Sequence, residues 1–90
     1  MRIQDVEWPR GIQDKVEGHH GLLPEEVESA LFDRRARIKR AGPDRYILLG
    51  RSENGAHVFV VYAYARGVAR VITARRMDQK ERRIYQRAGK

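Results

Sequence analysis

The segment from His57 to Ala65 limits the fold of this chain more than any other feature. Apolar side chains occupy both of its alternating sets of positions, Val58, Val60 and Tyr62 in one and Phe59, Val61 and Ala63 in the other. Successive side chains of a strand point to opposite faces of its sheet, so a strand of this kind needs cover on both faces. The pattern predicts a central strand, with the sheet built around it.

Turn residues on both sides of this segment predict an antiparallel meander. Asn54-Gly55 precedes it and Gly67 follows it, as is typical of hairpin connections. We expect the neighbouring strands at Tyr46–Ser52 and Ala69–Ala74. A further strand at Ala36–Arg40 alternates charged with apolar residues, which favours a protected position at the edge of the sheet.

The N-terminal third predicts short elements separated by breaks. We expect a strand within Ile3–Trp8, two helical turns at Gly11–Glu17, a flexible link at 18–21 and a helix at Pro24–Asp33. Pro24 suits the first turn of that last helix, because its missing N–H has no intrahelical partner there.

A capping box predicts the C-terminal helix. Asp78 is followed three residues later by Glu81, the spacing at which each side chain accepts a hydrogen bond from the other residue's backbone N–H, so we expect a helix at Asp78–Arg87. With 90 residues the chain is expected to form a single domain spanning residues 1–90. The expected fold class is α+β, with short N-terminal helices packed on a three- to four-stranded antiparallel sheet and a C-terminal helix.

Composition narrows the functional classes. The chain is 41% hydrophobic and 34% charged and has no cysteine, which is typical of a soluble globular protein without disulfide or thiolate chemistry. No apolar run is long enough to span a bilayer, and residues 1–5 lack the hydrophobic stretch of a signal peptide. We expect a cytoplasmic protein that has no membrane partner.

The net charge of +7 is unevenly distributed. Residues 1–33 contain three basic and eight acidic residues, a net charge of −5, whereas residues 34–90 carry +12. A basic half of this kind favours a polyanionic partner, because each Lys or Arg placed at a phosphate releases condensed counterions. A highly charged, solvated surface is the alternative interpretation.

Arginines at the strand ends predict an anion site. A meander brings the end of its first strand, the start of its second and the end of its third to one edge of the sheet, so Arg51 should lie near Arg75 or Arg76. The N-terminus of the last helix should arrive at the same edge and favour an anion there. Salt bridges from these arginines to the helix Pro24–Asp33, to Glu53 or to Glu81 are the competing interpretation.

The turn before the central strand leaves two registers open. If 53–55 is a three-residue loop with Gly55 left-handed, Arg51 lies opposite His57 and shares its face. If Asn54-Gly55 is a two-residue turn, Arg51 shares its face with Val58 instead, since a slip of one residue transfers side chains to the other face.

The order of several segments resembles the BrnT family of toxins over nearly the whole chain. The most specific part is Gly50-Arg51-Ser52 followed by Ala74-Arg75-Arg76, Glu81-Arg82 and Tyr85; Trp8, His20-Gly21 and 24–26 agree as well. The resemblance implies a RelE-like ribonuclease fold and toxicity through cleavage of cellular RNA, which inhibits translation and growth. It also implies neutralisation by a ribbon-helix-helix antitoxin in a heterotetramer or larger complex, with operator DNA bound only through the antitoxin.

Metal-independent transesterification is the mechanism we expect, in which a ribose 2′-hydroxyl attacks the adjacent phosphate. It needs a base, an acid and positive charge at the phosphorane. Arg51, Arg75 and then Arg76 are the candidates for charge stabilisation, and His20, followed by Glu81, His57 and Tyr85, for proton transfer. Further RNA contacts are expected from Arg70, Lys80, Arg82 and Arg83, and no cofactor or metal is expected. The alternatives are a non-catalytic basic module that binds RNA or DNA and a module that docks an acidic protein.

Overall fold

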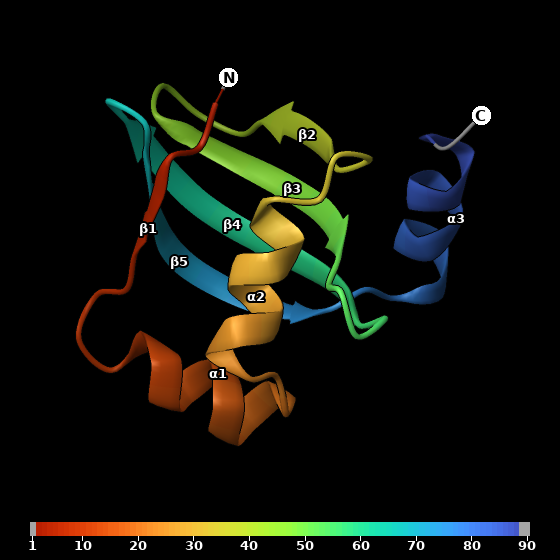
Figure 1. The fold of residues 1–90 in the computed structure, drawn as a ribbon, viewed down its shortest axis with the longest axis horizontal. Coiled ribbons are helices and arrows are strands. Elements are labelled where there is room, and N and C mark those ends of the chain that lie inside the picture. The colour runs from red at the N-terminus through yellow and green to blue at the C-terminus, as the bar shows by residue number, and fades with distance from the viewer. Residues whose placement is uncertain (1, 89–90) are drawn as a thin grey trace.

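A five-stranded sheet of strand order β1-β5-β4-β3-β2 forms the centre of the structure (Figure 1). The computed structural model describes residues 2–88. Its elements in chain order are β1 (Asp5–Glu7), α1 (Ile12–His20), α2 (Pro24–Leu31), β2 (Arg37–Arg40), β3 (Arg45–Arg51), β4 (His57–Ala65), β5 (Val68–Arg76) and α3 (Gln79–Ala88).

Strand β4 lies in the middle of the sheet and is covered on both faces, as its apolar pattern predicted. Val58, Val60 and Tyr62 are fully buried in the larger core, which includes the buried apolar residues of α1 and α2. On the opposite face, Phe59 packs against a smaller cluster of Leu49, Met77 and Tyr85, which fixes α3 to the sheet. The two helical layers therefore lie on opposite faces of one sheet.

The sheet is mixed and has five strands, so the prediction of a three- to four-stranded antiparallel sheet was wrong. Strand β1 lies within the segment predicted to be a strand, but it pairs in parallel with β5, in the register Asp5 opposite Val68. Turn signals detect strands that are neighbours in sequence, whereas β1 reaches the sheet from a distant part of the chain. Hydrogen bonds from the N–H groups of Gln4 and Asp5 to the carbonyl of Gly67 hold its start.

The predicted flexible link at 18–21 is also wrong, because α1 continues through Gly18 to His20. Gly21, and not Gly18, ends this helix: it adopts a left-handed conformation with φ of 65°, and its N–H donates to the carbonyl of Glu17. Glycine is common directly after a helix because this conformation is strained for other residues. His20 therefore occupies the last turn of a helix.

The turn between β3 and β4 is a three-residue loop, which decides the register. Gly55 has a φ of 96°, and the N–H of Ser52 donates to the carbonyl of Ala56 at 2.9 Å. Arg51 consequently pairs with His57, so their side chains share the face of the sheet on which α3 packs. Of the two registers that the sequence left open, the structure has this one.

A close approach at Gly50 brings β3 against the end of α2. A Cβ atom at this position would lie 2.4 Å from the carbonyl oxygen of Ala30, a distance that no side chain tolerates. The absence of a side chain lets the strand reach the helix end, which places Arg51 beside Asp33. None of the helices in residues 2–88 has both the length and the apolar character needed to cross a membrane.

Candidate functional site

A pocket of about 310 Å³ lies where the ends of β3 and β4 meet α3. It is lined by Arg35, Arg51, His57, Tyr85 and Gln86. Three of these residues, Arg35, Arg51 and Tyr85, also line a larger hollow of about 700 Å³ that extends towards α2. The described pocket thus combines two guanidinium groups, an imidazole and a phenol.

Asp33 connects the parts of this pocket through hydrogen bonds. Its Oδ2 accepts from the hydroxyl of Tyr85 at 2.5 Å and from the backbone N–H of Arg51 at 2.8 Å. Its Oδ1 accepts from the backbone N–H of Arg35 at 3.0 Å. One carboxylate just beyond α2 therefore links β3, α3 and the segment that carries Arg35.

The pKa of Asp33 reflects these hydrogen bonds. Partial burial raises the pKa of this carboxyl group, but the hydrogen bonds from Tyr85 and from the N–H groups of Arg35 and Arg51 together outweigh burial and lower it. Asp33 is therefore charged at neutral pH and keeps its acceptor role throughout the physiological range.

His57 and Tyr85 are both present in their neutral forms at neutral pH. Burial, followed by the charges of Arg82 and Arg51, lowers the pKa of His57, so its imidazole is free to accept a proton. Burial and the hydrogen bond to Asp33 raise the pKa of Tyr85 to about 12. The two rings are in edge-to-face contact, with centroids 5.8 Å apart, which fixes the imidazole against the phenol.

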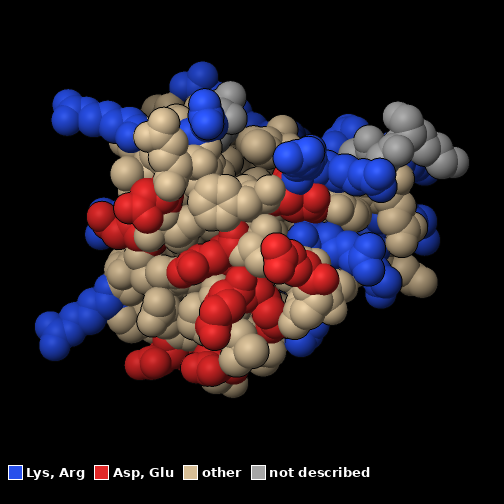
Figure 2. Space-filling view, in the orientation of Figure 1, with Lys and Arg blue, Asp and Glu red and all other residues tan. Residues whose placement is uncertain are grey.

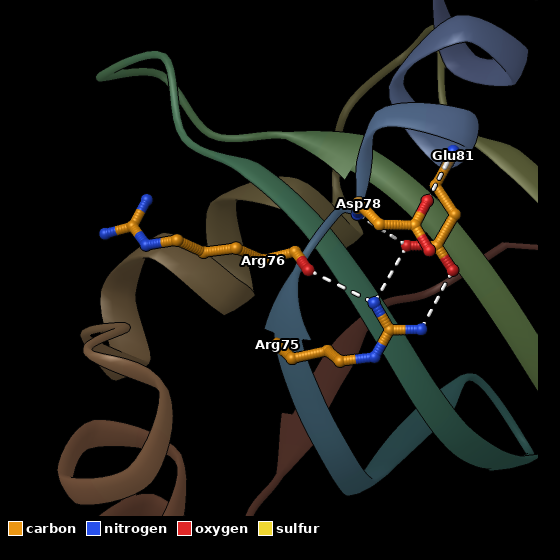
Figure 3. Close-up of polar contacts among 4 residues, drawn as sticks. All are labelled: Arg75, Arg76, Asp78 and Glu81. Atoms are coloured by element: carbon orange, nitrogen blue, oxygen red, sulfur yellow. Dashed lines mark hydrogen bonds and ion pairs between the residues drawn. The ribbon is translucent and has the colours of Figure 1, made fainter.

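Arg75 is held in an ion pair at the start of α3 (Figure 3). Its guanidinium makes two hydrogen bonds to the carboxylate of Glu81, at 2.8 and 2.9 Å, and lies 3.9 Å from the centroid of the Phe59 ring. The hydrogen bonds to Glu81 raise the pKa of Arg75, and the same bonds lower the pKa of Glu81. The competing interpretation of a salt bridge to Glu81 therefore holds for Arg75.

The N-terminus of α3 already has its own anions. The N–H of Asp78 donates to Glu81 at 2.9 Å and the N–H of Glu81 donates to Asp78 at 2.8 Å, which confirms the predicted capping box. Two carboxylates at this point repel a further anion. The carboxylates of Asp78 and Glu81 therefore compete with any anion for the N–H groups at this helix end.

Arg76 points to the opposite face of the sheet from Arg75, because neighbouring residues of a strand alternate. Figure 3 shows its side chain extending away from the Arg75 and Glu81 pair. Its Nη2 lies 3.4 Å from the carbonyl oxygen of Gly21, directly after His20 in the chain. His20 and Arg76 thus belong to the side covered by α1 and α2, and neither lines the pocket around His57.

The residues expected to contact RNA differ in position. Lys80, Arg82 and Arg83 are exposed on α3, and Arg82 is near enough to His57 to lower its pKa. Arg70 is exposed on β5 and forms an ion pair with Glu7 at 3.4 Å. Arg70 therefore lies at the β1 edge of the sheet, away from the pocket.

Sequence reasoning missed Asp33, Arg35 and Gln86 as parts of this site. Asp33 was assigned to the end of a helix, and Arg35 lies between that helix and an edge strand in a segment given no role. The available signal was an acidic residue followed at once by Arg34 and Arg35 where the helix ends. No local pattern relates these residues to Tyr85, which is 52 positions beyond Asp33.

Charges are segregated on the face of the molecule that carries α1 and α2. Figure 2 shows acidic side chains gathered over α1 and α2, whereas Lys and Arg lie towards the margins and around α3. Within residues 2–88, no group of three His, Cys, Asp or Glu side chains is arranged to hold a metal ion. The pocket lies between the two charged regions, because its lining combines residues that follow α2 with residues of α3.

Comparison with known proteins identifies relatives of this architecture. A family model described as "Ribonuclease toxin, BrnT, of type II toxin-antitoxin system" matches residues 9–81. The 1.1 Å crystal structure of the Brucella abortus ribonuclease toxin BrnT has a similar fold, with a TM-score of 0.66 and 19% sequence identity over 83% of this chain and 97% of that one. No curated protein sequence gives a significant match.

Proposed function

The chain belongs to the BrnT family of ribonuclease toxins of type II toxin-antitoxin systems, and from this membership we propose that it cleaves cellular RNA at the pocket around Arg51 and His57. The observation that carries the proposal is the convergence of two arginines with a neutral imidazole. Cleavage of RNA in the cytoplasm would inhibit translation and arrest growth. We also propose that its fold is of the RelE-like kind.

The proposed reaction is a metal-independent transesterification. The imidazole of His57 takes the proton of a ribose 2′-hydroxyl, whose oxygen forms a bond to the adjacent phosphorus. The bond from phosphorus to the 5′ oxygen breaks, and that oxygen takes a proton from a water molecule. The hydroxide that remains takes the proton from His57, which returns the imidazole to its neutral form. A base that is neutral at the working pH is suited to the first step, and the lowered pKa of His57 supplies it.

Arg51 and Arg35 supply positive charge for the phosphorane. Both are exposed and line the same pocket as His57, and a guanidinium presents paired N–H donors to phosphate oxygens. The hydrogen bond from the backbone N–H of Arg51 to Asp33 holds this part of β3 in place. Tyr85 supports the imidazole by ring contact, and Lys80, Arg82 and Arg83 extend the basic surface along the RNA.

The other residues expected to be catalytic take different roles in this proposal. Arg75 and Glu81 fix the start of α3 to the sheet through their ion pair. His20 and Arg76 lie on the face covered by α1 and α2, where they would contact RNA that continues past the edge of the sheet. Arg70 would contact RNA only on a longer path, because its charge is paired with Glu7.

The proposed partner is a ribbon-helix-helix antitoxin. Family membership in a type II system implies a protein antitoxin. We propose a heterotetramer or larger complex that covers the pocket and binds operator DNA only through the antitoxin. Co-expression with the neighbouring reading frame, followed by light scattering on the purified complex, gives the mass that checks this stoichiometry.

Induced expression tests the enzymatic proposal. Wild type should arrest growth and cleave RNA, whereas Arg51→Ala and His57→Ala should each cleave about 100- to 1,000-fold more slowly, because a preorganised charge or base is lost. Arg45→Ala is the matched control, since Arg45 lies on the same strand and the same face as Arg51 but at the opposite end. Equal loss in Arg45→Ala would contradict a localised site.

A non-catalytic RNA- or DNA-binding module is the second candidate, and the segregated positive charge favours it. It predicts that wild type binds RNA without cleaving it. In that case Arg51→Ala and Arg45→Ala should weaken binding to similar extents at fixed salt.

A further inference from the structure

Phe32 is exposed at the edge of the candidate site. Directly after α2, it keeps 52% of its surface accessible and is the most exposed large apolar side chain among residues 2–88. It lines the larger hollow together with Arg35, Arg51 and Tyr85. Exposure of a phenyl ring to water costs free energy, and here the ring lines the same hollow as the arginines assigned to the phosphate.

The hollow has a charge gradient along its length. At one end it shares Arg35, Arg51 and Tyr85 with the pocket of His57. At the other end it shares Glu25, Ser29, Ser52 and Glu53 with a third hollow, which also includes Glu26. Asp33 also lines the first end, but the positive charges of Arg35 and Arg51 outnumber its single negative charge, so a phosphate is attracted to this end and repelled from the second. Phe32 lines the larger hollow and neither of the other two.

We propose that Phe32 stacks an unpaired base of the RNA next to the phosphate held by Arg35 and Arg51. The substrate class is therefore single-stranded RNA, and the inference deepens the proposed ribonuclease function on which it rests. A base inside a duplex has both faces covered by its neighbours and cannot reach the ring, whereas a base in a single strand stacks readily on aromatic side chains.

The carboxylates give the strand a direction in the hollow. Glu28 is held in position because its Oε2 accepts a hydrogen bond from the indole N–H of Trp8 at 2.7 Å. Repulsion by Glu25, Glu28 and Glu53 keeps the phosphates at the arginine end, so the base is the part of the nucleotide that extends towards α2. Neutral bases with amino groups also donate hydrogen bonds to carboxylates, whereas phosphates cannot.

Binding measured without cleavage tests the stacking step on its own. The probe is a short single-stranded RNA that contains 2-aminopurine, with 2′-O-methyl ribose throughout so that no 2′-hydroxyl is available for attack. Wild type should quench the 2-aminopurine fluorescence, and Phe32→Tyr should do the same. Phe32→Leu, which keeps apolar volume but no aromatic face, should lose the quenching and bind about 5- to 100-fold more weakly.

Ile38→Ala is the matched control, because Ile38 is 45% exposed but lines neither the larger hollow that contains Phe32 nor the pocket of His57. It should bind and quench as wild type does, and circular dichroism should show that all variants remain folded. If wild type and Phe32→Leu bind and quench equally, the proposal is overturned. A loss of antitoxin binding alone in Phe32→Leu, with unchanged RNA binding, would overturn it in favour of a protein contact.

Cleavage assays separate this inference from the proposed function. Wild type should cleave single-stranded RNA and leave the same sequence intact in a duplex, with Phe32→Leu slower on the single strand. Cleavage of both forms at equal rates would overturn the stacking proposal while supporting the ribonuclease. Absence of cleavage with retained, Phe32-dependent quenching would reject the ribonuclease and support the base site.

Discussion

At the scale of single residues, Asp33 connects more of the candidate site than any residue that was predicted to be catalytic. It accepts hydrogen bonds from Tyr85, Arg51 and Arg35, which come from three different segments. A carboxylate that satisfies several N–H and O–H donors fixes their relative positions, because each lost hydrogen bond leaves a desolvated group without a partner. Asp33 is therefore a positioning residue for the pocket.

Removal of either partner of the Asp33 and Tyr85 hydrogen bond should destabilise the fold. We expect Tyr85→Phe to lower the free energy of unfolding by ~1 kcal/mol and Asp33→Asn by ~1–3 kcal/mol, since the latter weakens three hydrogen bonds. Urea unfolding of both variants and of the double variant measures the coupling between them. Fully additive losses would contradict a direct interaction.

The pH dependence of cleavage should follow the protonation of the His57 imidazole. Its lowered pKa means that kcat/KM should rise with pH through an inflection below 6.5 and be level at neutral pH. Burial is the largest cause of the shift, followed by Arg82. Arg82→Ala should therefore move the inflection to higher pH. If His57→Ala still cleaves RNA and its kcat/KM falls at acidic pH as in wild type, another group is responsible for the titration.

At the scale of secondary structure elements, the contact between β3 and α2 places the site. Gly50 allows it, because any side chain there would meet the carbonyl of Ala30. This contact also fixes the next two residues. The backbone N–H of Arg51 donates a hydrogen bond to Asp33, and the buried Ser52 accepts one at its Oγ from the N–H of Ala56. Backbone packing thus determines where the cationic side chain lies.

Gly50→Ala should destabilise the protein by ~1–3 kcal/mol, as is typical when atoms are added to a closely packed site. Gly18→Ala is the matched control, because Gly18 lies within α1 and has no atom within 4 Å of the added Cβ. Replacing this helical glycine should stabilise the protein by about 0.5–1 kcal/mol. Thermal unfolding should show a lower melting temperature for Gly50→Ala and a higher one for Gly18→Ala than for wild type.

The secondary structure predictions that depend on short segments of the sequence agree with the structure. The strands around β4, the edge strand β2 and the capping box of α3 follow from local periodicity and spacing, and the structure confirms them. Strand β1 lies within the predicted segment, but its parallel pairing with β5 was missed, since β5 is remote in sequence. The end of α1 was misplaced, because sequence alone does not reveal which of two glycines adopts the left-handed conformation.

At the scale of the whole molecule, charge separates along the chain and across the surface. Residues 1–33 form β1, α1 and α2 and carry the excess of acid, whereas the basic excess follows them. Figure 2 shows the acidic side chains over the helices. This distribution attracts negative charge towards α3 and repels it from α1 and α2, which is the orientation that the proposed binding of RNA requires.

The affinity for single-stranded RNA should fall steeply with salt. Each phosphate contact contributes a slope of about −0.7 in a plot of log K against log salt concentration. Arg51→Ala should reduce the slope by about that amount, whereas Arg45→Ala should not if the RNA follows the candidate site. Titrations between low and moderate salt measure the slopes. A flat response in wild type would exclude phosphate contacts as the main source of affinity.

By itself, the sequence determined the central strand, its antiparallel neighbours, the last helix and the concentration of positive charge in residues 34–90. These depend on periodicity, turn residues and charge, which act over a few positions or require only counting. It also placed Arg51 at the correct end of its strand, although two possible turns left open the face of the sheet on which its side chain lies.

Only the tertiary structure decided which charged groups meet. Arg75 and Arg76 are adjacent in sequence, yet one pairs with Glu81 and the other reaches Gly21 on the opposite face of the sheet. Asp33 and Tyr85 meet across 52 positions. The physical reason is that a side chain's partner depends on the alternation of strand faces and on the packing of distant elements, neither of which is encoded within any short segment of the chain.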